Sequence, residues 1–121
     1  MQPQGHIQVI RNLIDFGLDA QAALDAPRWY IHGVGKNQDS SDVKESSIEL
    51  EDRYGGLGDG GFDGGETTAL ELIKKGHNIA KVAVGSDRSI FGRGQIITRD
   101  FAGVLCGGSD PRADGCAIPL A

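Results

Sequence analysis

The sequence alternates between segments of helical and strand periodicity, and glycines or prolines separate them. In the first such segment, apolar residues recur at spacings of three and four, as on one face of a helix. This predicts an amphipathic helix over 6–16 that buries one face, made of Ile7, Ile10, Leu13 and Ile14. Gly17 suits the position that ends the helix.

A second, short helix is predicted directly after the first. Asp19 has the kind of side chain preferred at a helix N-cap, and the alanines that follow favour helix. Pro27 disfavours helical geometry at Ala26, so the helix should end there. The stretch "RWYIHG" that follows reads as a strand, and "SIELEDR" reads as a half-exposed strand because it alternates apolar and charged residues.

The second half of the chain contains one more helix and three more strands. Thr68 and Glu71 have the T-x-x-E spacing of a capping box, and Gly76 suits the position after the helix end. "HNIAKVAVG" reads as a strand, and "QIITRD" and "GVLCGGSD" read as a hairpin around "DFAG". The order predicts one α/β or α+β domain over 1–121, with 33–66 as a polar, glycine-rich loop insertion.

The stretch "GLGDGG" at 56–61 matches the G-x-G-x-x-G spacing of dinucleotide-binding loops. A capping box at Thr68 would start the helix too late for such a loop, and Asp87 lies farther away than the usual ~20 residues. A glycine- and aspartate-rich calcium loop would need several stacked copies of its motif. We therefore interpret the stretch as a flexible surface insertion and expect no cofactor.

Composition excludes several other functions. The formal net charge of −5 disfavours non-specific binding to nucleic acid or to anionic membranes. No apolar run approaches the ~20 residues of a spanning helix, and the first residues, "MQPQGH", lack the regions of a signal peptide. We expect Cys106 and Cys116 to be small buried residues, while a disulfide between them remains possible.

Few side chains have the spacing of a reactive or metal-binding site. His6, His32 and His77 are too scattered to suggest zinc ligands, so no metal is expected, although His6 stands at the start of the first helix. "GSDPR" at 108–112 is either a turn or a substrate contact, and we favour the turn because Asp precedes Pro. In that turn, Arg112 can pair with Asp110 or with Asp114.

Four spaced motifs, "MQPQGH", "DAPRW", "FGRGQ" and "GSDPRADG", together with "KKGHNI", resemble the late part of the small subunit of the γ-glutamyltransferase (γ-glutamyltranspeptidase) family. The resemblance covers about two thirds of the chain, at both ends and in order, and 33–66 lies outside it. It implies the C-terminal portion of the four-layer αββα sandwich of N-terminal nucleophile hydrolases.

The same resemblance implies where the chemistry lies. Family members cleave themselves, and the new N-terminal threonine attacks the γ-glutamyl carbonyl while a glycine pair binds the oxyanion. Both elements precede the segment that corresponds to Met1 in the family, and the threonines of this chain are internal: Thr67, Thr68 and Thr98. We therefore expect no catalytic residue here, and only proximity to substrate for Gln2, Gln4 and His6.

Two functions remain open. The chain is expected to be part of a γ-glutamyltransferase-like hydrolase that acts on glutathione-type substrates and is inactive alone. Alternatively, it is a binding or assembly module without catalysis. In that case the uncovered sheet face would pack against a second copy or a nucleophile-bearing subunit, because large exposed apolar surfaces mark interaction sites.

Overall fold

The structure is a computed structural model and describes residues 1–33, 46–52 and 64–119. The chain divides into two compact units, Met1–Ala26 with Ser86–Ala121, and Pro27–Gly85. The single domain over 1–121 and the insertion at 33–66 stay predictions, and most of that insertion lies outside the described residues.

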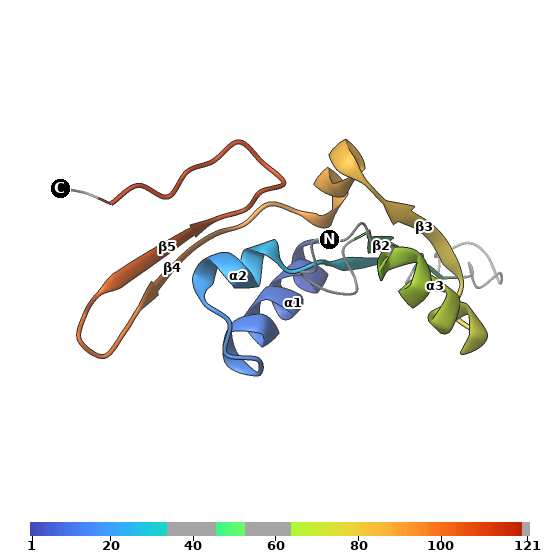
Figure 1. Ribbon diagram of the computed structural model, residues 1–121, viewed down its shortest axis with the longest axis horizontal. Coiled ribbons are helices and arrows are strands. Elements are labelled where there is room, and N and C mark those ends of the chain that lie inside the picture. Colours follow the sequence, from blue (N-terminus) through green and yellow to red (C-terminus); the bar gives the residue numbers. More distant parts are fainter. Residues whose placement is uncertain (34–45, 53–63, 120–121) are drawn as a thin grey trace, which may run out of the picture. The chain divides into compact units, whose positions relative to one another are not determined.

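The first unit combines two helices with a hairpin. Its helices are α1 (Gln2–Ile14) and α2 (Ala20–Asp25), and β4 (Gln95–Arg99) pairs antiparallel with β5 (Leu105–Ser109). The 3₁₀ helix η1 (Gly85–Phe91) precedes β4 and ends at the fully buried Phe91. Figure 1 shows α2 beside the hairpin, whose two strands were predicted from the sequence.

The predicted buried face of the first helix is wrong. α1 begins at Gln2, earlier than predicted. Pro3 fits in its first turn, because the backbone N–H groups there have no partner within the helix and proline lacks only this group. Ile7, Ile10 and Ile14 are 57%, 52% and 75% exposed. α1 instead turns its half-buried Val9 and Leu13 inward, and no residue of α1 is fully buried.

The core of this unit is centred on α2. Ala20, Ala23 and Leu24 are buried, and the Asp19 carboxylate accepts a 2.8 Å hydrogen bond from the Ala22 amide, as predicted for its N-cap. A Cβ at Gly108 would lie 2.8 Å from the backbone carbonyl of Ala20. Glycine at this position therefore lets the backbones of β5 and α2 approach closely.

The second unit is a three-stranded sheet with one helix. Its strands β1 (Trp29–His32), β2 (Ser47–Glu51) and β3 (Ile79–Ala83) have the order β1-β2-β3, antiparallel and then parallel. α3 (Gly64–Lys74) lies between β2 and β3 in the chain and packs on both (Figure 1). The parallel pair with its helical crossover makes this unit a βαβ arrangement preceded by one antiparallel strand.

The helix of this unit begins earlier than predicted. α3 starts at Gly64, so Thr68 lies inside the helix and the capping box is wrong. At the other end, Gly76 has φ +90° and the His77 amide donates to the Leu72 carbonyl, the arrangement that closes a helix with glycine. A late helix start is therefore no longer an argument against a dinucleotide-binding loop. The stretch "GLGDGG" itself lies outside the described residues.

The cysteines differ from the expectation of small buried residues. Cys106 lies in β5 and Cys116 in the irregular segment that follows, and both are exposed free thiols. The prediction that they are buried was wrong because few residues cover the β4–β5 hairpin.

Within the described part of the chain, no helix has the length and apolar character needed to cross a bilayer.

Candidate functional site

The three residues expected near substrate lie together at the start of α1. Gln2 and His6 are exposed and Gln4 is half-buried. The Gln8 side chain donates a 2.9 Å hydrogen bond to the Gln4 carbonyl. The N-cap, Met1, makes no side-chain capping bond, and the first turn has no acidic residue.

This helix start has a defined chemical preference. Amide groups at a helix N-terminus carry partial positive charge, which favours anions and developing oxyanions. None of the three side chains is a nucleophile of the kind that the family uses. The described geometry therefore supports binding or orientation at this point, and the role of Gln2, Gln4 and His6 stays a prediction.

A buried ion pair between two residues that follow β5 is hydrogen-bonded to the end of α2. Arg112 Nη1 lies 3.0 Å from Asp110 Oδ1, and both side chains are fully buried. The same guanidinium donates to the carbonyls of Leu24 and Ala26, at 2.7 and 3.0 Å, while Asp110 accepts from the Gly94 amide at 2.9 Å. "GSDPR" is thus a turn in which Arg112 pairs with Asp110, one of the two pairings predicted.

Two side-chain amides that were not predicted from the sequence make further hydrogen bonds between these elements. Asn12 donates to the Ala23 carbonyl at 3.3 Å, and Gln21 exchanges two bonds with the Ser109 backbone, at 2.9 and 3.0 Å. Neither residue belongs to a motif or a periodic apolar pattern, so no sequence signal marked them. Together with Arg112 they fix α1, α2 and β5 to one another.

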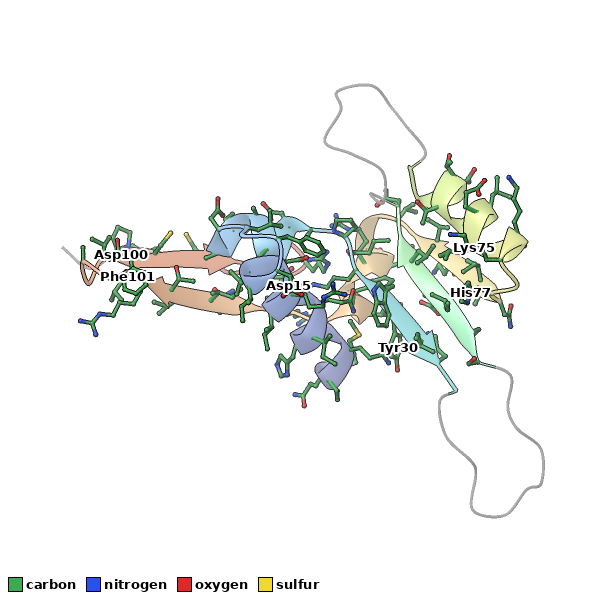
Figure 2. All side chains as sticks on the ribbon, turned by 90° about the horizontal axis from the view of Figure 1, so that it is seen from below. Asp15, Tyr30, Lys75, His77, Asp100 and Phe101 are labelled. Atoms are coloured by element: carbon green, nitrogen blue, oxygen red, sulfur yellow. The ribbon has the colours of Figure 1, made fainter. Side chains whose placement is uncertain are left out.

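A polar cluster occupies one face of the sheet in the second unit. The rings of Tyr30 and His32 contact each other at a tilt of 59°, with centroids 4.1 Å apart, and His32 Nε2 lies 2.9 Å from Glu49 Oε1. Figure 2 shows Tyr30 on β1, and His77 with Lys75 near the end of α3. Among the described residues, no three His, Cys, Asp or Glu side chains converge as metal ligands.

The described threonines occupy structural positions. Thr67 and Thr68 lie within α3, and the Thr98 hydroxyl in β4 donates to the Cys106 carbonyl at 3.4 Å. All three are flanked by helix or strand on both sides, so none of their backbone amides is a free amine. A nucleophile of the family type would need such an amine as its base.

Comparisons with known proteins point to one family. A sequence model of the family described as gamma-glutamyltranspeptidase matches residues 1–120, including the segment without motif resemblance. The glutathione hydrolase-like YwrD proenzyme of Bacillus subtilis (strain 168) is 30% identical over 119 residues. That match covers 98% of this chain and 19% of the relative.

Solved structures share the fold. Cephalosporin acylase from Bacillus halodurans is 40% identical with a TM-score of 0.66, over 94% of this chain and 17% of that one. Gamma-glutamyltranspeptidase from Pseudomonas nitroreducens, complexed with L-DON, has a TM-score of 0.60 over 97% and 49% of the two chains. At 23% identity, the second likeness concerns the fold alone.

These matches confirm the predicted fold class, a mixed α/β portion of the N-terminal nucleophile hydrolase sandwich. The chain spans less than one fifth of the hydrolase-like relative and of the acylase. Because the family match covers nearly all of its residues, the chain belongs to the γ-glutamyltranspeptidase family.

Proposed function

We propose that these residues serve γ-glutamyl transfer or hydrolysis as one part of a larger catalytic assembly. The observation that carries the proposal is the family match over residues 1–120 together with the 19% share of a glutathione hydrolase-like relative. In this assembly the nucleophilic threonine and the oxyanion donors come from other residues. The start of α1, with Gln2, Gln4 and His6, lies near the substrate.

The exposed apolar surface supports the same view and also the alternative. Large side chains stand in solvent on α1 and on the hairpin, including Ile14 at 75% and Phe101, which is fully exposed. Surfaces of this kind mark interaction sites. A nucleophile-bearing subunit would cover them in the catalytic proposal, and a second copy of the chain would cover them in a non-catalytic assembly module.

The experiment measures release of the chromophore from a γ-glutamyl anilide. We expect no turnover by the 121-residue chain alone. Turnover should appear when the chain is refolded with the part of the Bacillus subtilis relative that lies outside the matched segment. The control is the same mixture in which the threonine proposed as the nucleophile is replaced by alanine.

The two outcomes separate the proposals. Turnover by the highly purified chain alone contradicts the assignment of the nucleophile to other residues. A mixture that associates without turnover contradicts the catalytic proposal and favours the assembly module.

A further inference from the structure

The short loop between η1 and β4 lies against the start of α1. An ideal Cβ at Gly5, in the first part of α1, would lie 3.9 Å from the Phe91 carbonyl oxygen, so the helix packs on the chain where η1 ends. Phe91 is fully buried, which fixes this end of the loop. Gly92 follows with φ +87°, a conformation that suits glycine, and Gly94 is the last residue before β4.

The other end of this loop is bonded to Asp110. The Gly94 amide donates to Asp110 Oδ2 at 2.9 Å, and the Asp110 amide donates to the Gly94 carbonyl at 3.1 Å. The Asp110 side chain is fully buried, and hydrogen bonds to an ionised carboxylate are stronger than those between neutral groups. Both backbone groups of Gly94 are thus fixed by one residue.

The two carboxylate oxygens of Asp110 serve different parts of the first unit. Oδ1 accepts from the backbone amide and from Nη1 of Arg112, both at 3.0 Å, and this guanidinium also binds the end of α2. Oδ2 binds the loop that supports the start of α1. These contacts are internal to the unit, so they do not depend on what covers its exposed surface.

The start of α1 has little stabilisation of its own. Its N-cap, Met1, makes no side-chain capping bond, and the Gly5 amide makes the first intrahelical bond, to the Met1 carbonyl at 2.9 Å. Helix ends fray, and a glycine in the first turns favours fraying further. The position of this helix start therefore depends on the chain segment against which it packs.

We propose that Asp110 is a positioning residue for the start of α1. By fixing Gly94 it fixes the loop that supports Gly5, and it thereby sets where the three residues expected near substrate lie. The inference rests on the proposed function, because that proposal puts the start of α1 near a substrate. Asp110 acts through the loop and not on the substrate, since its carboxylate is buried and bonded to Gly94 and Arg112.

Asp110→Asn tests the link between the loop and the helix. Asparagine offers one oxygen to two sets of donors, so its NH2 group must face either Gly94 or Arg112. The oxygen should stay with the cation, which leaves the Gly94 amide without its acceptor. Hydrogen exchange of the 121-residue chain, followed by NMR, should then be at least about fivefold faster at the Gly5 amide relative to the Ile10 amide, the ratio expected for one lost hydrogen bond.

A second variant disturbs the loop without changing the buried ion pair. Gly92→Ala places a Cβ at φ +87°, where it strains the turn out of η1. It should accelerate exchange at Gly5 relative to Ile10 in the same way. Circular dichroism checks that both variants remain folded.

Two controls separate this local effect from a general loss of stability. Ser109→Ala changes the residue next to Asp110 and removes a 2.7 Å bond from Ser109 Oγ to Gln95 Oε1, which joins the two strands beyond the loop. Leu24→Ala destabilises the unit from α2 and leaves the bonds of Asp110 in place. In both controls the ratio of exchange at Gly5 and Ile10 should stay within about twofold of its original value.

The effect on substrate is measured in the reconstituted mixture with the γ-glutamyl anilide. Asp110→Asn should raise KM at least about fivefold and change kcat less than about twofold, because a displaced binding surface loses interactions that the ground state and the transition state share. Ser109→Ala should leave both constants within about twofold of those of the unaltered chain.

The outcomes distinguish this proposal from the proposed function. Equal acceleration at Gly5 and Ile10 in Asp110→Asn overturns the link between Asp110 and the helix start. Local acceleration with an unchanged KM, in a mixture that turns over substrate, overturns the positioning role. A mixture without turnover even for the unaltered chain contradicts the proposed function, and the exchange ratios then still decide whether Asp110 fixes the start of α1.

Discussion

At the scale of single residues, we expect the buried contacts of Arg112 to contribute more to the stability of the first unit than an exposed ion pair does. Its guanidinium is fully buried and contacts Asp110 and two carbonyls of the α2 end. Removing one partner of a buried pair leaves the other charge uncompensated in a medium of low dielectric constant. The cost of such a change should be far larger than for an exposed pair.

We therefore predict that Arg112→Met lowers the free energy of unfolding by about 3–5 kcal/mol. The matched control is Arg11→Met, because Arg11 pairs with Asp15 at 2.8 Å in an exposed position and should cost less than about 1 kcal/mol. Urea denaturation followed by circular dichroism measures both values. Similar losses in the two variants would show that the buried pair has no special weight.

Gly108 is the second residue with a sharp steric requirement. A Cβ there would lie 2.8 Å from the Ala20 carbonyl group, and backbone cannot move aside as a flexible side chain can. We predict that Gly108→Ala lowers the stability by about 1–3 kcal/mol through overpacking. Gly5→Ala is the control, because its Cβ would meet nothing closer than 3.5 Å inside α1 and should stabilise by up to about 1 kcal/mol. An unchanged melting temperature in Gly108→Ala would contradict the close approach of β5 and α2.

At the scale of elements, existence and order were predictable because local signals decide them. Asp19 caps α2, Pro27 sets its end, and the glycines after α1 and α3 have positive φ. Which face of an element is buried was less predictable. The apolar residues of α1 are regularly spaced in the sequence. Within the described residues, however, α1 packs on α2, which covers only part of the helix.

This difference leads to a prediction for α1. Ile14→Lys should change the stability of the chain by less than about 0.5 kcal/mol, because its side chain is mostly in water. Leu24→Ala, at a fully buried position of α2, should cost about 2–5 kcal/mol through lost contacts and a cavity. Thermal melts of both variants decide the point. A large loss in Ile14→Lys would show that α1 buries its apolar stripe in solution.

At the scale of the whole molecule, the fold class and the family were predictable from four motifs, and the family match confirms both. The candidate site was only partly predictable. Gln2, Gln4 and His6 all lie at the start of α1, and their proximity to substrate stays a prediction. The fixing contacts of Asn12 and Gln21 could not be predicted, since they join segments far apart in the sequence and depend on tertiary packing.

The contacts of Arg112 also have a consequence for how the chain folds while it is being made. Arg112 is 88 residues after Leu24, the carbonyl that it binds, and the unit that contains both is split around Pro27–Gly85. At about 5–20 residues per second, a ribosome needs roughly 4–18 seconds to make the intervening chain. During that interval the carbonyls at the end of α2 must stay bonded to water, while the uninterrupted middle segment can already fold. The contacts at the end of α2 are therefore completed only after Arg112 has been added.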